Sequence, residues 1–247
     1  MLGCGTSHGV PMIGCECRVC LSDNPKNNRT RSALYLKGDG CSTLIDAPPE
    51  LRLQLCREGI AFADQVILTH AHADHVMGLD DLRRFNDVTG RPLPIYAQEP
   101  VLEAVRRIVP YALQAPDKVG GGVPSFELYE APAMLDPEIE LFEVMHGTLA
   151  VLGVKVRGFA YLTDVSEIPS VVKERLMNLE TLIVDATRIA PHSTHYHLEK
   201  ALQVIEELGP RLAYLTHLAH DYDYDEWAGR LPAGVALSYD GLQIEVA

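Results

Sequence analysis

The sequence predicts a mixed α/β fold. Short β-type runs recur along its 247 residues, and segments with helical spacing of apolar residues lie between several of them. Candidate metal ligands follow directly after four of these runs. No internal repeat or low-complexity linker divides the chain, so we expect one domain over residues 1–247.

The individual elements follow from local patterns. The β-type runs are short and rich in branched and apolar side chains, and they cover residues 32–36, 42–45, 66–69, 139–145, 152–156, 160–163, 182–184 and 213–216. Apolar stripes with helical spacing, two of them opened by proline, predict helices over residues 100–109, 169–176 and 198–208. Asp240 and Gly241 predict the turn of a closing hairpin.

The net charge of the chain limits the kinds of binding partner to expect. The 21 basic and 34 acidic residues give a formal net charge of −13, which argues against a broad surface for long nucleic acid. The negative net charge does not exclude a small anionic substrate, because divalent ions bound in a site would dominate the local electrostatic field. No signal peptide is evident, and no apolar run approaches the ~20 residues of a membrane span. We therefore expect a cytoplasmic protein that does not bind membranes.

The densest motif covers residues 69–75, Thr-His-Ala-His-Ala-Asp-His. It offers four candidate ligands directly after an apolar run: His70, His72, Asp74 and His75. Neutral imidazoles and carboxylates suit zinc and its first-row neighbours. A solvated histidine-rich loop is the alternative, but clustered histidines add nothing to a core and repel one another once protonated. The motif therefore predicts a metal site.

Three further candidates end later β-type runs: His146, Asp164 and His217. A single polar residue at a strand end is usually a cap or turn residue. With His70, four candidate ligands each follow a β-type run. If these strands end at the same edge of a sheet, the four side chains are expected to meet in one cavity.

The order and spacing of these seven residues resemble the metallo-β-lactamase superfamily over nearly the whole chain. The resemblance implies a four-layer αββα sandwich, in which two mixed β-sheets pack together with helices outside. It also implies two divalent ions, zinc or manganese. His70, His72 and His146 would bind the first, Asp74, His75 and His217 the second, and Asp164 would bridge them.

Details of the pattern discriminate among relatives. Diiron members usually have glutamate at the position of His72, and true β-lactamases have cysteine at that of Asp164. This chain instead resembles the dinuclear hydrolases, such as ribonuclease Z, glyoxalase II and the lactonases. Asp46, after the run 42–45, matches the family's aspartate that orients a ligand imidazole. The family's usual glycine after it is replaced by Ala47.

Six cysteines are present, and Cys15, Cys17 and Cys20 form a cluster. Without a secretion signal a disulfide framework would be unusual, so thiolate ligands are the better interpretation. The other three cysteines are expected to be small buried residues. The motif Gly-Cys-Gly-Thr-Ser-His-Gly-Val-Pro at residues 3–11, followed by the cluster, resembles the PhnP group of cyclic phosphate phosphodiesterases.

In that group the three thiolates and a later histidine hold a structural zinc ion. Here that histidine is His220, with His8 and His192 as alternatives, and the zinc-binding loop covers about residues 12–30. The group also has a histidine as general acid near the leaving group. The resemblance assigns this role to His195, although neighbouring His192 and His197 keep the choice open.

The resemblance implies hydrolysis of small or cyclic phosphodiesters by a hydroxide held between the two ions, with Asp74, Asp164 and His195 as catalytic residues. A thioester or lactone hydrolase is the nearest alternative. A ribonuclease Z-like nuclease would need a basic arm, and no such insertion is visible. The alternative outside the enzymes is a non-catalytic relative that binds metal without hydrolysing a substrate. A homodimer is permitted, and the family's first strand is abbreviated or completed upstream of Met1.

Overall fold

A computed structural model describes residues 1–38, 40–114, 122–136 and 138–246. The chain divides into two compact units, each with its own sheet and core. One unit consists of Leu2 and Ala33–Ala131. The other consists of Met1, Gly3–Ser32 and Pro132–Ala247.

The unit of Ala33–Ala131 contains a mixed five-stranded sheet in the order β1-β2-β3-β4-β5. Only the pair β1 and β2 is antiparallel, and the other neighbours are parallel. The strands are β1 (Leu34–Lys37), β2 (Ser42–Ile45), β3 (Gln65–Ile67), β4 (Leu93–Ala97) and β5 (Phe126–Glu130). Because β2 and β3 are parallel, the residues after Ile45 and Ile67 leave the sheet at the same edge.

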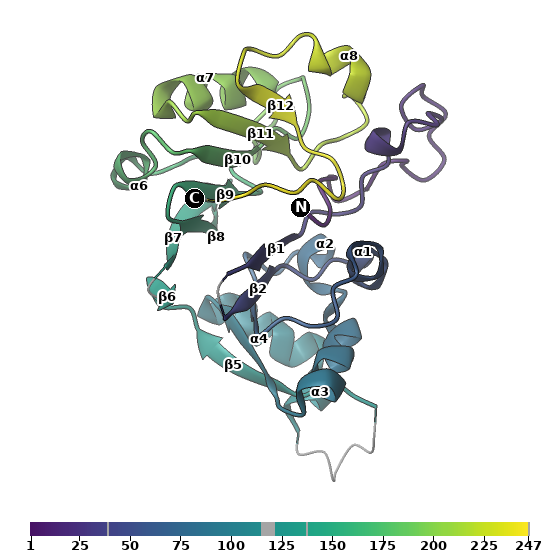
Figure 1. Ribbon diagram of the computed structural model, residues 1–247, viewed down its shortest axis with the longest axis vertical. Coiled ribbons are helices and arrows are strands. Elements are labelled where there is room, and N and C mark those ends of the chain that lie inside the picture. The colour runs from purple at the N-terminus through teal and green to yellow at the C-terminus, as the bar shows by residue number, and fades with distance from the viewer. Residues whose placement is uncertain (39, 115–121, 137, 247) are drawn as a thin grey trace. The chain divides into compact units, whose positions relative to one another are not determined.

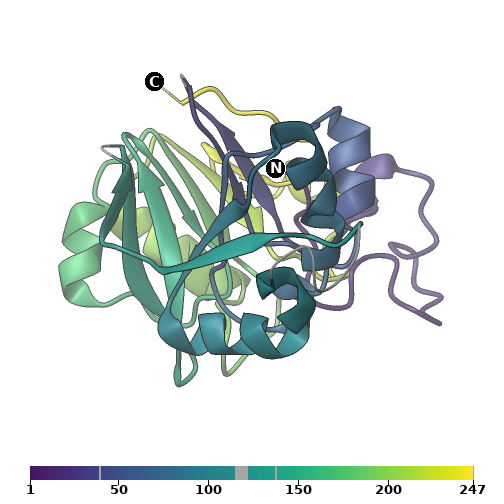
Figure 2. The ribbon, with the colours of Figure 1, turned by 90° about the horizontal axis from the view of Figure 1, so that it is seen from below.

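The helices of this unit bury their apolar stripes against the sheet. In α4 the side chains of Val101, Leu102 and Val105 are buried in the same core as Val66 and Ile95. Figure 2 shows α4 lying along β5. The helices are α1 (Leu51–Glu58), α2 (Ala73–Val76), η2 (Leu79–Leu82), α3 (Arg83–Thr89), α4 (Glu99–Ile108) and η3 (Pro110–Leu113).

The second unit contains a mixed seven-stranded sheet in the order β12-β11-β10-β9-β8-β7-β6. Strands β9 to β12 are parallel, whereas β6 to β9 are joined antiparallel. The strands are β6 (Met134–Asp136), β7 (Ile139–His146), β8 (Leu149–Val156), β9 (Phe159–Leu162), β10 (Thr181–Asp185), β11 (Leu212–Thr216) and β12 (Val235–Leu237). The parallel strands β9, β10 and β11 therefore all end at one edge.

Helices cover one face of this second sheet (Figure 1). Alternate residues of β10 and β11, such as Leu182, Val184 and Leu215, share a core with Ala201 and Leu208 of α7. Figure 2 shows α6 beside the strands of its own unit. The helices are η1 (Pro25–Asn27), α6 (Ser170–Arg175), α7 (Leu198–Leu208) and α8 (Tyr224–Ala228).

Most predicted elements are confirmed, with differences at their ends. Each of the eight β-type runs overlaps a strand, and all three predicted helices are present. The prediction of a closing hairpin at Asp240 and Gly241 is wrong. A turn is present, but no strand follows it among the described residues, and the amide of Gly241 donates instead to the carbonyl oxygen of Met1. Of the three cysteines predicted to be buried, Cys4 is buried, whereas Cys41 is half-buried and Cys56 is exposed.

The expected mixed α/β class with two mixed sheets and flanking helices is confirmed. Among the described residues, no helix combines the length and the hydropathy needed to cross a bilayer.

Candidate metal clusters and catalytic residues

The loop that follows β3 gathers the imidazoles of the densest motif. His70 Nε2 lies 3.0 Å from His72 Nδ1, and the rings of His70 and His75 have centroids 4.1 Å apart. In the short helix α2, His75 Nε2 lies 3.3 Å from Asp74 Oδ2. All but His72 are buried. The four predicted ligands of this unit therefore form one compact group.

Asp46 holds this group in place from the end of β2. Its carboxylate lies 2.7 Å from His75 Nδ1 and accepts a 2.8 Å hydrogen bond from the amide of Thr69. The hydroxyl of Thr69 in turn lies 3.0 Å from His70 Nδ1. Burial raises the pKa of Asp46, while its interactions with His75 and Thr69 lower it. Asp46 thus orients His75 directly and His70 through Thr69.

A close backbone approach sets the position of α2. A Cβ atom added to Gly78 would lie 2.0 Å from the carbonyl oxygen of Pro48, so only glycine fits there. The amide of Ala47 donates to the carbonyl oxygen of His75 over 2.7 Å, and the amide of Gly78 donates to that of Ala47 over 2.8 Å. The segment after Asp46 therefore lies directly against the helix that carries two ligands.

The second unit has its own cluster at the ends of its strands. His217 Nε2 lies 3.4 Å from Asp164 Oδ2, and His195 Nε2 lies 4.0 Å from the same oxygen. The ring of His195 is stacked on that of His217, with centroids 4.8 Å apart, and it lies at 61° to the ring of His146, with centroids 4.4 Å apart. The structure thus brings His146, Asp164 and His217 together with the predicted proton donor.

Asp185, the last residue of β10, connects these side chains. Its carboxylate lies 2.7 Å from His195 Nδ1 and accepts hydrogen bonds from the amide of Val165 at 3.1 Å and the hydroxyl of Thr187 at 2.8 Å. The Thr187 hydroxyl lies 2.9 Å from His217 Nδ1. Asp185 is fully buried, so it supports His195 directly and His217 through Thr187.

Backbone conformation distinguishes three of the site residues. Asp46, Asp164 and His217 have φ angles of 65°, 54° and 58°, in the left-handed region that non-glycine residues seldom adopt. All three follow the end of a strand. Such strain persists only where surrounding structure fixes it, and it is concentrated at functional sites.

The imidazoles are arranged as metal ligands usually are. Four of the five have Nδ1 beside an oxygen of a neighbouring group, namely Thr69 for His70, Asp46 for His75, the carbonyl of Thr194 for His146 and Thr187 for His217. This pattern fixes the tautomer and presents Nε2 to an ion. The 3.0 Å between His70 and His72 nitrogens is near the about 3.3 Å of two imidazoles on one tetrahedral zinc ion. The donor set fits divalent metals.

The cysteine cluster is complete within the second unit. The Sγ atoms of Cys15, Cys17 and Cys20 lie 3.2, 3.6 and 3.5 Å from Nδ1 of His220. Bond lengths of about 2.3 Å to sulfur and 2.0–2.1 Å to nitrogen give about 3.6 Å in a tetrahedral zinc site. Burial raises the pKa of Cys20 to about 11, and the Cys20 amide lowers that of Cys17. A bound ion would deprotonate both thiols.

The remaining predicted histidines are placed differently from His195. The ring of His192 lies 4.9 Å from that of His195, and burial, followed by the charge of His195, lowers its pKa. His197 is the N-cap residue of α7 and belongs to no group of closely spaced ligand atoms among the described residues. His8 is exposed in the first loop, and His220, rather than His8 or His192, accompanies the thiols.

Comparison with known proteins decides the family. The model of the Beta-lactamase superfamily domain matches residues 42–218, which include His70, Asp164 and His217. The chain belongs to the beta-lactamase superfamily. Membership implies divalent metal ions and hydrolase chemistry, in agreement with the histidine and aspartate clusters of both units.

Among solved structures, this superfamily member is similar to a diphosphatase from the PhnP family. That structure shares 36% identity and a TM-score of 0.91, covering 100% of this chain and 96% of the other. The chain is also 37% identical, over 98% of its length, to an octanoyltransferase of Porphyromonas gingivalis. A ribonuclease Z of Natronomonas pharaonis is 30% identical over 49% of the chain. The chain spans 50% and 41%, respectively, of these two curated relatives.

Two supporting residues of this superfamily site, Asp185 and Thr187, were not among the residues predicted from the sequence. Asp185 directly follows a predicted β-type run, so the rule that identified His146, Asp164 and His217 would have found it. Thr187 gave no comparable signal, because a threonine after a strand is common in turns. Its role depends on its position between Asp185 and His217.

Proposed function

We propose that the chain is a divalent-metal-dependent hydrolase of small or cyclic phosphodiesters. The assignment of ligands follows the family resemblance, with His70, His72 and His146 for one ion, Asp74, His75 and His217 for the other, and Asp164 shared. The Cys15, Cys17, Cys20 and His220 group is proposed as a structural zinc site. Zinc or manganese suits the histidine and aspartate ligands, and zinc suits the thiolates.

The pairing of His195 with Asp185 carries the proposal. A buried carboxylate 2.7 Å from Nδ1 fixes the orientation of the His195 ring and directs Nε2 toward the region of Asp164, 4.0 Å away. A histidine in that position can protonate a departing alkoxide, a contribution of about 10²–10⁴-fold. Hydrolysis of alkyl phosphodiesters needs such a donor, because an alkoxide is a poor leaving group.

When bound, a pair of divalent ions activates water and stabilises the charge that develops on a phosphoryl group. The residues of this chain supply the geometry. Asp46 and Thr69 orient the imidazoles after β3, Thr187 orients His217, and Asp185 holds His195 in one ring orientation. His195 holds the proton at Nε2 until the leaving group takes it.

A second substrate class shares this chemistry. The PhnP-family diphosphatase is similar over the full chain, which supports cleavage of a diphosphate at the same phosphoryl centre. A diphosphate has a better leaving group and depends less on His195. Thioester or lactone hydrolysis and a ribonuclease Z-like activity are weaker candidates, since the cysteine cluster and His195 favour the PhnP type. Acyl transfer stays outside the proposal, because the chain accounts for only 50% of the octanoyltransferase's length.

A substrate panel with two variants tests the proposal. The metal-loaded protein should hydrolyse bis(p-nitrophenyl) phosphate and a nucleoside 2′,3′-cyclic phosphate faster than lactones or thioesters. Asp164→Ala should abolish both activities and weaken metal loading. Glu180→Gln, on an exposed ion pair at the start of β10, is the matched carboxylate control and should be unchanged. Unchanged hydrolysis by the Asp164 variant, or a preference for lactones, would contradict the assignment.

A further inference from the structure

Arg29 is a completely buried arginine that the proposed chemistry does not use. Its relative exposure is 1%, and it is among the largest fully buried side chains of the chain. Among the residues that the structure describes, its guanidinium makes no ion pair, and its Nε has no hydrogen-bond partner. A buried guanidinium without a directly paired carboxylate is costly, so its other contacts must account for it.

Those contacts are backbone carbonyl groups of one loop. Nη1 donates to the carbonyl oxygen of Ala219 at 3.1 Å, and Nη2 donates to that of Tyr222 at 2.6 Å. Nη2 also donates to Asn27 Oδ1 at 3.3 Å. The two carbonyl groups lie on either side of His220, the histidine of the cysteine cluster. Arginine suits this task because its planar fork carries five donors and no acceptor.

The same loop begins at His217, one of the proposed active-site ligands. On that side, the amide of Ala219 donates to the carbonyl oxygen of Thr187 at 2.9 Å, and Thr187 contacts His217 through its hydroxyl. Leu218 forms an isolated β-bridge with Gly5. The loop therefore carries ligands of two different sites within four residues and is fixed from both of its sides.

Arg29 is itself fixed to the N-terminal segment. Its amide donates to the carbonyl oxygen of Val10 at 2.7 Å and its carbonyl accepts from Val10 at 2.9 Å. A Cβ atom on Gly5 would lie 2.5 Å from the Arg29 carbonyl oxygen, so the first loop packs closely against it. Arg29 thus joins the N-terminal segment to the loop after β11, in addition to the bridge between Gly5 and Leu218.

We propose that Arg29 is a positioning residue that sets the geometry of both His220 in the cysteine cluster and His217 in the active site. The inference rests on the proposed metal sites. Removing groups that hold a ligand in place typically costs about 10- to 100-fold in metal affinity or activity. A merely structural arginine would instead lower stability and leave the properties of the folded protein unchanged.

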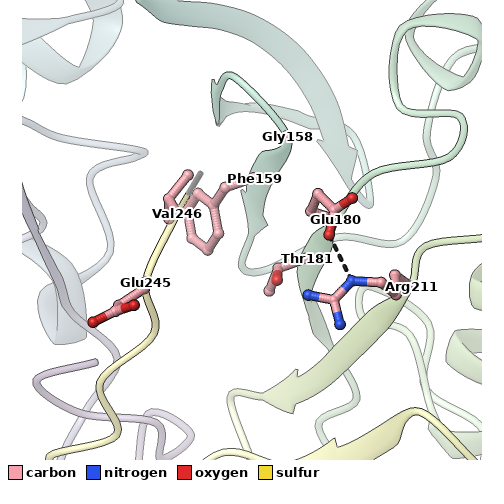
Figure 3. Close-up of a pocket in the computed structure, with 7 residues that line it drawn as sticks. All are labelled: Gly158, Phe159, Glu180, Thr181, Arg211, Glu245 and Val246. Carbon is pink, nitrogen blue, oxygen red and sulfur yellow. Dashed lines mark hydrogen bonds and ion pairs between the residues drawn. The ribbon is translucent and has the colours of Figure 1, made fainter.

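Arg29→Met and Arg29→Lys test this inference, with Arg211→Met as the matched control. Arg211 is 66% exposed and forms an ion pair with Glu180 (Figure 3), and these two residues directly precede the strands β11 and β10. Four quantities are measured at a temperature well below each variant's unfolding midpoint: zinc content, the rate of zinc transfer to a chromogenic chelator without substrate, kcat and KM. Cobalt substitution gives a spectroscopic measure of thiolate ligation.

Arg29→Met should release zinc from the cysteine cluster about 10- to 100-fold faster and lower kcat by a similar factor, with KM little changed. Arg29→Lys keeps a cationic donor, so its zinc-release rate and kcat should lie between those of Arg29→Met and the unmodified protein. If Arg29→Met does not fold, the Arg29→Lys variant tests the inference. Arg211→Met should match the unmodified protein.

Folded Arg29 variants with unmodified zinc release, cobalt spectrum and kcat would overturn the inference. Faster zinc release without phosphodiesterase activity in any form of the protein would support the effect on His220 but contradict the proposed function.

Discussion

Replacing Asp185 with Asn tests the proton-donating role of His195, with metal content as a control because Asp185 also supports His217 through Thr187. The Asp185 carboxylate faces three donors: His195 Nδ1, the amide of Val165 and the hydroxyl of Thr187. An amide has a single acceptor oxygen, so it cannot accept hydrogen bonds from all three groups in the way the two carboxylate oxygens do. At least one hydrogen bond to a buried charged group is lost, at a cost of about 1.5–3 kcal/mol in the free energy of unfolding.

The catalytic effect should depend on the leaving group. With an alkoxide leaving group, as in a cyclic nucleotide, kcat should fall about 10²–10⁴-fold, because Asn no longer holds His195 in position to donate a proton. With p-nitrophenolate as leaving group, kcat should stay within about fivefold, because that group departs without a proton. The assay compares kcat for the two substrates in the metal-loaded protein. Equal losses on both, with unchanged metal content, would refute the assignment of His195 as donor.

Three other perturbations have defined outcomes. Cys17→Ser should lose one zinc ion per chain and destabilise the protein by about 3 kcal/mol or more; full zinc content by elemental analysis would contradict the cluster. Gly78→Ala forces a Cβ atom to 2.0 Å from the Pro48 carbonyl oxygen and should cost about 1–3 kcal/mol in urea unfolding. Gly229→Ala, with open space around its Cβ, is its control, and equal midpoints would argue against the close approach. Removal of metal by a chelator should lower the unfolding temperature, and metal should restore it.

The sequence was sufficient where a pattern was local. The run over residues 198–208 is a helix with the predicted bounds, because apolar spacing and a buried stripe coincide there. Strand β4 was missed because it contains Pro94, and β5 because charged residues alternate with its apolar ones. Neither pattern is distinct from a loop without knowledge of the neighbouring strands.

The ligands could be found, but some of the residues that position them could not. Asp185 was within reach, because it obeys the same strand-end rule as Asp164. Arg29 was not, since an arginine in a polar loop usually lies at the surface. Its carbonyl partners, Ala219 and Tyr222, are 190 and 193 residues away in sequence. Only the folded chain shows that they lie together.

A metal titration of the chelator-treated protein tests the central claim most directly. Phosphodiesterase activity should return only as about two divalent ions per chain bind in addition to the thiolate-bound zinc, and Asp164→Ala should take up fewer ions and stay inactive. Full activity in the metal-free protein, or activity that returns in the Asp164 variant, would contradict the account.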